Sequence, residues 1–477
     1  MRVFAVVVMA VIGSLPVSAG DLYVDPVAGL DSNDGSLGSP FQTIQAAVDA
    51  AQAGDSVLLQ SGVYNSRRSV STNSDFQTIV ELKRTHRGTL GNPITIKNAP
   101  GARPVLELTA DHNHAFYGNG ASHFVIEGLE MVGNSRFLRS MSVADVRSTY
   151  DKRDPIRDNS GIWIYGFAGF APSAENSGTD ITIRDNTIRD FGNSGIRIGR
   201  TDVITIEGNR IHDNAEYSEE GGSGISIGGD LYDSVDSVNP SEPRIVVREN
   251  VIHNNRNLMP FTTFGGSTIT DGNGIILDNI DGYDDPIRIE NNVIFGNGGA
   301  GIQAFNYVTE GIVEAINNTT VNNGDGVQAD KANLDFRGEF VEAIVKNNIS
   351  VAGFGDSLLI IDGGLVNATV ENNLLWAPGT ISSLQIRGSS LSDLLLDPLF
   401  VDALGNDYRL DPLSPAIDAG VLTDAPAFDI LGVARPSGSA VDIGAFETAI
   451  PEPAAGLLLI LALPLLMRRS TDDDSVR

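Results

Sequence analysis

The sequence predicts an all-β solenoid, a right-handed parallel β-helix, and three observations support this fold. An eight-residue phrase, approximately I-x-I-x-x-N-x-I, returns at intervals of 23 to 42 residues. Before the asparagine the phrase alternates apolar and polar residues, which is typical of a strand with one buried face. One such strand cannot bury its face alone, so the copies must stack as successive coils.

An asparagine occupies the same position in seven copies of the phrase. These residues are Asn186, Asn209, Asn250, Asn292, Asn318, Asn348 and Asn373. A buried amide costs free energy unless it is hydrogen-bonded, and at a tight bend it can bond to its neighbours in the coils above and below. We therefore expect an asparagine ladder that holds the coils together and binds no ligand.

A second phrase, G-[IV]-x-[ILA], follows the first and predicts the next strand of each coil. It begins at Gly161, Gly195, Gly224, Gly274, Gly301 and Gly326. The connection between the two phrases is long after Asn209 and after Asn250. We expect the loops 215–223 and 256–273 to project from one side and to wall a groove.

The remaining segments complete a five-part plan for the chain. Residues 1–19 have the basic start, apolar run and small final residues of a signal peptide, which predicts an exported protein. Residues 20–64 would cap the coil, with Ser39 as the N-cap of a short amphipathic lid helix. The β-helix would follow over 65–400, then a C-terminal module over 401–448 and a sorting or anchor segment over 449–477.

Composition excludes several classes of partner. The formal net charge is -29, with 32 basic against 61 acidic residues, which argues against nucleic acid, and the chain has no cysteine for disulfides or thiolate metal sites. Hard cations such as Ca²⁺ suit this charge better. The apolar run 454–467 would span only about 21 Å as a helix, short of a ~30 Å hydrocarbon core, so we expect a weak or transient membrane anchor at most. We expect a monomer.

The outward residues two places before each asparagine predict a charge ladder on the surface. They read Arg184, Glu207, Arg248, Glu290, Ile316, Lys346 and Glu371. Neighbouring coils lie about 4.8 Å apart, so these side chains would stack with mostly alternating sign. Each exposed pair would contribute at most about 1 kcal/mol.

The second phrase presents a different outward face. One column runs Trp163, Arg197, Ser226, Ile276, Gln303, Gln328, and the next runs Tyr165, Gly199, Gly228, Asp278, Phe305, Asp330. Rings that stack on sugar faces, mixed with polar groups for hydroxyls, predict a site for an extended sugar chain. We assign substrate contacts to Trp163, Tyr165, Gln303, Phe305 and Gln328 and a catalytic role to Arg197. An ordinary solvated face is the alternative.

Carboxylates flank this face and predict a calcium site. The candidate ligands are Asp278, Asp281, Asp284, Asp285, Asp325 and Asp330. Loop aspartates also form turns, which is the structural alternative. Lys331 follows the face directly, where an amine with a lowered pKa would remove the proton next to a uronate carboxylate.

Several segments resemble known families. Asn33-Asp34-Gly35 and Ser39-Pro40-Phe41 are similar to the opening of secreted β-helix proteins, including family 9 polysaccharide lyases. The stretch 325–331 resembles a segment of those lyases that ends in lysine, although Val327 replaces an aromatic residue and one extra residue precedes the lysine. The resemblance implies a pectate lyase-like fold and a catalytic Lys331.

The C-terminal segments carry two further resemblances. Residues 414–420, with Ser-Pro-Ala-Ile-Asp-Ala-Gly, and 441–447, with Val-Asp-Ile-Gly-Ala-Phe-Glu, look like the choice-of-anchor Q module. Pro451-Glu452-Pro453, the apolar run and Arg468-Arg469 resemble the PEP-CTERM sorting signal. This resemblance implies sorting by an exosortase-type machinery to the envelope or matrix of a bacterium.

Three functions fit these observations. The first is a polysaccharide lyase that acts on acidic polysaccharide by Ca²⁺-assisted β-elimination. The second is a non-enzymatic envelope or matrix protein that binds exopolysaccharide, which needs only the surface column and the sorting signal. The third is a glycoside hydrolase with paired carboxylates, which ranks last because Asp284-Asp285 stands without the other motifs of the polygalacturonase set.

Overall fold

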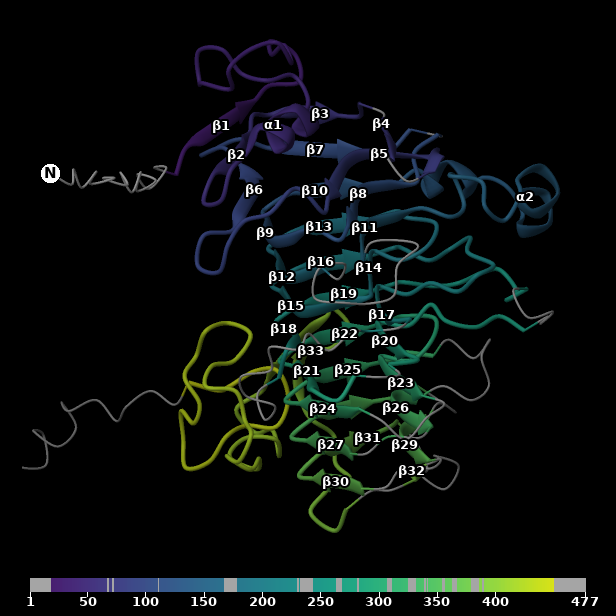
Figure 1. The fold of residues 1–477 in the computed structure, drawn as a ribbon. Coiled ribbons are helices and arrows are strands. Elements are labelled where there is room, and N and C mark those ends of the chain that lie inside the picture. The colour runs from purple at the N-terminus through teal and green to yellow at the C-terminus, as the bar shows by residue number, and fades with distance from the viewer. Residues whose placement is uncertain are drawn as a thin grey trace, which may run out of the picture.

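The chain winds into a stack of coils, each of which contributes one strand to each of three long sheets (Figure 1). This computed structural model describes residues 19–66, 68–70, 73–109, 111–166, 178–229, 231, 243–262, 268–280, 283–306, 311–324, 332–338, 340, 342–353, 357–362, 367–378, 386–387 and 390–449. Most of the expected signal and sorting segments, together with Asp281, Asp325, Gln328, Asp330 and Lys331, lie outside these ranges. Within them, no helix combines the length and the apolar character needed to cross a bilayer.

Three sheets run the length of the stack, and their strands pair in parallel between successive coils. Sheet A contains β1 (Asp21–Val24), β2 (Ser56–Leu59), β6 (Ile94–Asn98), β9 (Ser122–Glu127), β12 (Gly178–Arg184), β15 (Thr201–Glu207), β18 (Ile245–Arg248), β21 (Pro286–Glu290), β24 (Ile312–Ile316), β27 (Glu342–Lys346) and β30 (Asn367–Glu371). Sheet B contains β3 (Gly62–Tyr64), β7 (Pro104–Glu107), β10 (Glu130–Val132), β13 (Thr187–Arg189), β16 (Arg210–His212), β19 (Val251–His253), β22 (Val293–Phe295), β25 (Thr319–Val321), β28 (Ile349–Val351) and β31 (Leu374–Trp376). Sheet C contains β4 (Arg68–Val70), β5 (Asn73–Lys83), β8 (His114–Asn119), β11 (Ser160–Tyr165), β14 (Ile196–Gly199), β17 (Ile225–Gly228), β20 (Ile275–Asp278), β23 (Ile302–Asn306), β26 (Ala332–Gly338), β29 (Ser357–Asp362) and β32 (Ile386–Arg387), with β4 antiparallel to β5.

The alternating residues of the first phrase stack inside the coil as predicted. Ile181 pairs in register with Ile204, Ile204 with Ile245, and Ile245 with Ile287. All four side chains are buried. Because every coil covers the apolar face of its neighbour, burial of these columns supplies most of the driving force that holds the stack together.

The predicted asparagine ladder is confirmed at the turn between sheets A and B. The backbone N–H and the side-chain amide of Asn250 both donate to Oδ1 of Asn292, at 3.0 Å each, and Asn292 repeats this pattern with Asn318. The residue before each asparagine takes the left-handed conformation, with φ of 57° at Glu249 and 53° at Asn291. This conformation turns the chain sharply and points the amide inward.

A second asparagine ladder, which the sequence analysis did not predict, follows the sheet B strands β16, β19, β22 and β25. Asn214 donates to Asn255, Asn255 to Asn297, and Asn297 to Asn323, with side-chain distances of 2.8 to 2.9 Å. Asn323 then donates to Asn333. In these four coils, side-chain amide ladders therefore lie at both ends of the sheet B strand.

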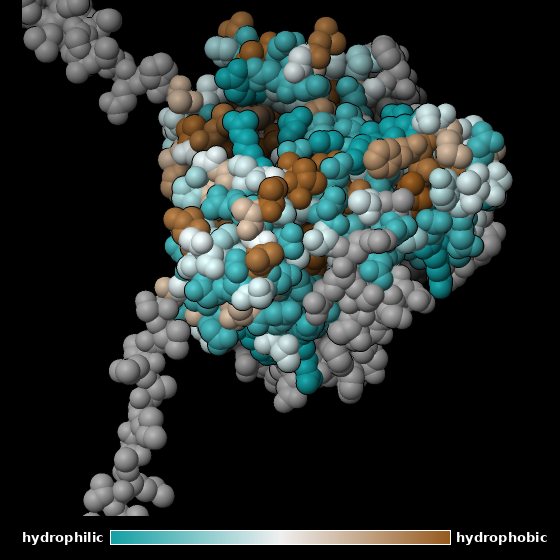
Figure 2. All heavy atoms as spheres, turned by 90° about the horizontal axis from the view of Figure 1, so that it is seen from above, coloured by the Kyte–Doolittle hydropathy of each residue, from teal (hydrophilic) through white to brown (hydrophobic). Residues whose placement is uncertain are grey.

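The N-terminal end is covered by the helix α1 (Ile44–Ala50), which contacts β1, β2 and β5. Thr43 caps this helix by accepting a hydrogen bond from Ala46, so the expected N-cap at Ser39 is wrong. The cap lies at Thr43 because the chain before it is fixed by strand-like contacts, with Phe41 bridging to Val24. Seen from above, this end presents small hydrophobic patches among larger hydrophilic areas (Figure 2).

The C-terminal part, residues 390–449, packs beside the lower coils and includes the antiparallel pair β33 (Phe400–Asp402) and β34 (Asp407–Leu410) (Figure 1). We call these residues the C-terminal module. The buried guanidinium of Arg435 anchors it, since it donates to Oδ1 of Asn291 at 3.1 Å and contacts Glu447 at 3.2 Å. Asn347 and Asn372 add side-chain hydrogen bonds to backbone carbonyls of the module.

The charge ladder is confirmed only in its upper part. Arg184 contacts Glu127, and Arg248 contacts Glu207, at 2.6 Å each with partly exposed side chains. Lower down the prediction of an exposed ladder is wrong, because Glu290 and Lys346 are only 7% exposed. In this part of the stack Lys346 lies 2.9 Å from Asp424 of the C-terminal module.

The register of sheet C differs from the expectation at one coil. Gly326 and Val327 were expected to begin the strand after β23, but that strand is β26, in which Leu334 stacks on Ile302 and Phe336 on Ala304. The larger side chains at 334 and 336 fill the core column better than the expected segment would. Asp335, not Gln328, is therefore the neighbour of Gln303.

Candidate functional site

The outer face of sheet C carries a groove of about 840 Å³. Its floor comes from strands β11, β14, β17 and β20, which supply Trp163, Arg197, Ser226 and Ile276. The connections from sheet B to sheet C supply one wall, with Glu220 and Phe261 as examples. The long loops expected to border a groove therefore do so.

This wall is held rigidly by a buried ion pair and a small apolar cluster. Arg157, 1% exposed, places Nη2 2.6 Å from Oε1 of Glu219, whose other oxygen accepts a hydrogen bond from Thr262. Side chains from three of the loops that join sheet B to sheet C pack together here, namely Leu138, Val146, Ile156, Tyr217 and Met259. The helix α2 (Val143–Thr149) projects from the stack at this point (Figure 1).

An aromatic cluster forms the upper end of the groove floor. The Trp163 ring lies 5.0 Å from the ring of His114, 5.4 Å from Tyr117 and 6.0 Å from Tyr165, measured between centroids. Phe76 adds an edge contact to Trp163 at 6.4 Å. Trp163 and Tyr165 are only half-buried, so they offer ring surface to a ligand.

Arg197 stands at the centre of this floor. Its guanidinium carbon lies 4.8 Å from the centroid of the Trp163 ring, a cation–π contact that fixes the side chain across the groove. Among the residues that the structure describes, Arg197 makes no ion pair. A half-buried, positioned and unpaired guanidinium is suited to bind a ligand carboxylate in a bidentate manner.

Two titratable groups beside Arg197 have shifted pKa values. Burial, together with the positive charge of Arg197, lowers the pKa of His114 to about 3, so this ring is neutral. Burial raises the pKa of Asp158, although this carboxylate accepts a hydrogen bond from Asn193 at 2.8 Å and feels the charge of Arg197. Carboxylates of Asp278, Asp271 and Glu220 line the groove edge.

The structure brings together Trp163, Tyr165, Arg197 and Asp278 of the predicted site. Gln303 lies in the same column but is only 4% exposed, and its amide is used between Asn273 at 3.2 Å and Asp335 at 3.1 Å. Phe305 is half-buried and stacks in register below Asp278. Gln328 and Lys331 lie outside the described residues.

The aspartates of the expected calcium site that the structure describes lie in different environments. Asp285 is buried, with Oδ2 3.4 Å from Arg244, while Asp284 is exposed and Asp278 faces the groove. No group of three or more His, Cys, Asp or Glu side chains in the described ranges could hold a metal ion. Asp281, Asp325 and Asp330 fall outside those ranges.

Sequence reasoning missed Phe76, His114, Tyr117 and Asp158. The strand β8 lacks the Gly-Ile phrase, since Ala115-Phe116 occupies that place, yet His114 pairs with Ser160 and Tyr117 with Trp163. An alignment of the aromatic residues at this position would have extended the column upward. Asp158 lies in a loop, where no periodic signal marks it.

Comparison with known proteins agrees with the fold. A family described as "Right handed beta helix region" matches residues 168–375. The predicted class, an all-β right-handed parallel β-helix, is therefore confirmed by the sheets and by this match.

Two relatives share recognisable sequence with the chain. The "Uncharacterized protein YwoF" of Bacillus subtilis is 24% identical over 472 residues, which cover 83% of this chain and 92% of that protein. "Pectate lyase PEL9" of Emericella nidulans is 27% identical over 285 residues, which cover 55% of this chain and 63%, less than two thirds, of that lyase. Among solved structures, pectate lyase Pel9A superposes with a TM-score of 0.47 and 19% identity over 91% of this chain and 97% of that chain.

Proposed function

We propose that the chain binds an acidic polysaccharide along the groove of sheet C and cleaves it at uronate residues by β-elimination. The observation that carries this proposal is Arg197, which is positioned on Trp163 and unpaired among the described residues. Trp163 and Tyr165 would stack on sugar rings while Arg197 binds the carboxylate of one uronate. The similarity to a protein named pectate lyase supports the same substrate class.

In this reaction a base takes the proton from the ring carbon next to the carboxylate. The electron pair forms a carbon–carbon double bond, the bond from the next carbon to the glycosidic oxygen breaks, and that oxygen leaves with the bonding pair and gains a proton. Arg197 would lower the barrier by stabilising the negative charge that develops on the carboxylate. We propose Lys331 as the base, on its sequence position directly before β26, a strand of the same sheet as the groove floor.

The elimination is tested by the ultraviolet absorbance of its unsaturated uronide product. Polygalacturonate, alginate and rhamnogalacturonan would each be incubated with the wild-type chain and with the Lys331→Met variant. We expect the absorbance to rise with at least one substrate. The rate of the variant should be about 10²- to 10⁴-fold lower, which is the usual contribution of a general base. Binding of a polymer without any absorbance change would favour the non-enzymatic, polysaccharide-binding function instead.

A calcium requirement is a separate part of the proposal, supported by the acidic edge of the groove at Asp278. We expect calorimetric titration of Ca²⁺ into chelator-treated protein to show saturable binding. The Asp278→Asn variant should weaken that binding by about tenfold or more, whereas Asp411→Asn, an aspartate of the C-terminal module, should leave it unchanged. The absence of any binding heat would remove calcium from the proposal.

We also propose that the protein acts outside the cytoplasm. The pattern of residues 1–19 and the Pro-Glu-Pro segment at 451–453 support export and sorting. Fractionation of cells that express the full chain, with and without residues 2–19, tests this point. Export of both forms, or of neither, would contradict it.

A further inference from the structure

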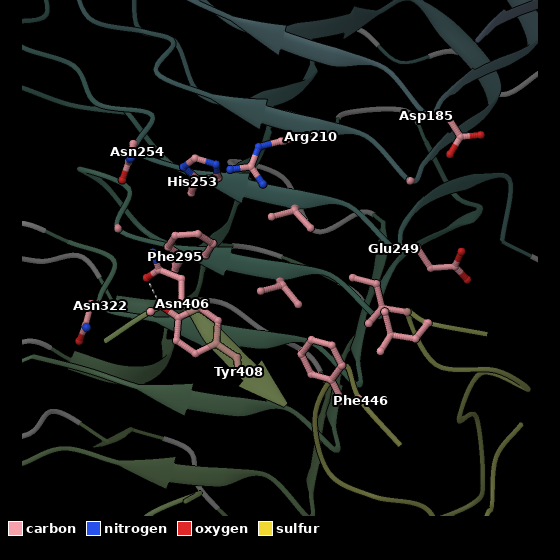
Figure 3. A pocket seen from close by; sticks show the side chains of 17 residues that line it. Asp185, Arg210, Glu249, His253, Asn254, Phe295, Asn322, Asn406, Tyr408 and Phe446 are labelled. Atoms are coloured by element: carbon pink, nitrogen blue, oxygen red, sulfur yellow. Dashed lines mark hydrogen bonds between the residues drawn. The ribbon is translucent and has the colours of Figure 1, made fainter. Parts of the chain in front are cut away.

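A second pocket lies on a different face of the stack, between sheet B and the C-terminal module. It encloses about 850 Å³, within the range of small-molecule sites. The β-helix contributes Arg210, His253 and Phe295 from β16, β19 and β22, and the module contributes Asn406, Tyr408 and Phe446 (Figure 3). Neither part forms this pocket alone.

Stacked rings build the back of this pocket. The His253 ring lies 4.7 Å from His212 and 4.8 Å from Phe295, nearly parallel to both. Tyr408 of the module continues the row at 5.3 Å from Phe295, and its hydroxyl donates to Asn406 at 3.0 Å. The row therefore spans the junction between the two parts.

His253 has unmet hydrogen-bonding capacity at this place. The residue is 6% exposed, and neither ring nitrogen has a hydrogen-bond partner among the described residues. Burial, with the nearby Arg210, lowers the pKa of His253 to about 4, so the ring is neutral and carries one donor and one acceptor. A buried polar group without a partner is energetically unfavourable, and a ligand that pairs with it would offset that cost.

The charged side chains of the pocket favour neither an anionic nor a cationic ligand. Arg210 is cationic and makes no ion pair among the described residues. Asp185 and Glu249 lie at the opposite end, and burial raises the pKa of both carboxyls (Figure 3). Amide side chains, Asn254 and Asn322, follow the strand ends on the other side.

We propose that this pocket binds a neutral saccharide unit, as a second glycan site separate from the groove of sheet C. Pyranose sugars have apolar ring faces and a rim of hydroxyls. Phe295 and Phe446, which are both half-buried, would contact the apolar faces, and Arg210, Asn406 and the nitrogens of His253 would pair with the hydroxyls. A site at this junction would hold the protein on a neutral polymer or side chain while the groove engages an acidic one.

Calorimetric titration with cellotetraose, xylotetraose and maltotetraose tests this proposal on the full chain. We expect saturable binding of at least one of them, weakened about tenfold or more in His253→Phe, which keeps the ring stack but removes the nitrogens, and in Arg210→Gln. The groove variant Trp163→Ala should bind the same tetrasaccharide as the wild type does.

Two outcomes would overturn it. One is the absence of saturable binding of all three tetrasaccharides to the wild-type chain. The other is binding that both His253→Phe and Arg210→Gln leave unchanged, whatever the effect of Trp163→Ala, because the ligand would then bind outside this pocket. The elimination assay uses acidic polymers, so a lack of elimination activity would not change the tetrasaccharide titrations of the wild type or of the variants. Failure of the proposed function is therefore distinguishable from failure of the second glycan site.

Discussion

At the scale of single residues, inward and outward positions follow different rules. Asn186, Asn209 and the later members of the first ladder were predicted because a strict spacing fixes them in one column. The pairing of Gln303 with Asn273 and Asp335 was not, since it depends on side chains from two other coils. Spacing reveals which way a residue points, but not which neighbours its side chain meets.

The buried His114 predicts a specific dependence of stability on pH. Its pKa is about 3 in the folded protein, against about 6.5 in an unfolded chain. Below pH 6.5 the unfolded chain binds a proton that the native protein does not. The free energy of unfolding therefore decreases by up to about 1.4 kcal/mol for each unit by which the pH is lowered. This stability is fully present above pH 6.5 and is lost as the pH falls toward 3.

Urea unfolding at pH 7 and pH 5 measures this effect. Between pH 7 and pH 5 the free energy of unfolding of the wild-type protein should decrease by about 2 kcal/mol more than that of His114→Gln, which cannot take up the proton. Because the comparison uses the change with pH and not the absolute stability, it holds even if the variant is less stable at both values. Equal losses would contradict a neutral, buried His114.

At the scale of strands and turns, the repeat predicted the main elements but misplaced one sheet C strand, because the second phrase occurs shortly before the strand that stacks on β23. Gly326-Val327 matches the second phrase, yet the strand is β26, because Leu334 and Phe336 continue the core column. The second asparagine ladder was missed because only four of the seven repeats carry an asparagine five positions after the first; Phe191, Gly353 and Pro378 stand there in the other three. Local pattern cannot decide between two candidate strands when stacking on the neighbouring coil selects one.

The asparagine ladder makes a testable contribution to stability. Asn292 accepts from the backbone of Asn250 and donates to the carbonyls of Val247 and Glu290, so Asn292→Ala leaves buried groups unpaired. Each unpaired buried group costs about 1–3 kcal/mol, so we expect chemical denaturation to show a free energy of unfolding lower by about 3 kcal/mol or more. Asn367→Ala, at an exposed strand position, should change stability by less than about 0.5 kcal/mol. Similar effects for both would show that the ladder is dispensable.

At the scale of the whole molecule, the C-terminal module is a part of the structural unit and not an appendage. It covers Glu290 and Lys346, which the sequence placed on an open surface, and it completes the pocket at sheet B. The sequence could not predict this docking, because the contacts join residues more than a hundred positions apart, such as Asn291 and Arg435. The groove on sheet C, in contrast, is built within four adjacent coils and was largely predictable.

Arg435 is the residue on which the docking depends. Its side chain is fully buried and contacts Glu447, Asn291 and backbone carbonyls, so Arg435→Ala should cost about 3–5 kcal/mol and release the module. Limited proteolysis should then cut within 390–449 while the coils stay resistant. Arg409→Ala, an exposed arginine of the same module, is the matched control and should keep the wild-type cleavage pattern.

The groove of sheet C is most directly tested by the affinity of Arg197→Ala for acidic polysaccharide. Dissociation constants would be measured by calorimetry with polygalacturonate and alginate fragments for the wild type, for Arg197→Ala and for Arg103→Ala, an exposed arginine outside the groove. Loss of a charged hydrogen bond of about 1.5–3 kcal/mol predicts that Arg197→Ala binds at least tenfold more weakly, with Arg103→Ala unchanged. Equal affinity of Arg197→Ala and the wild type, for a fragment that the wild type binds, would contradict the assignment of this groove.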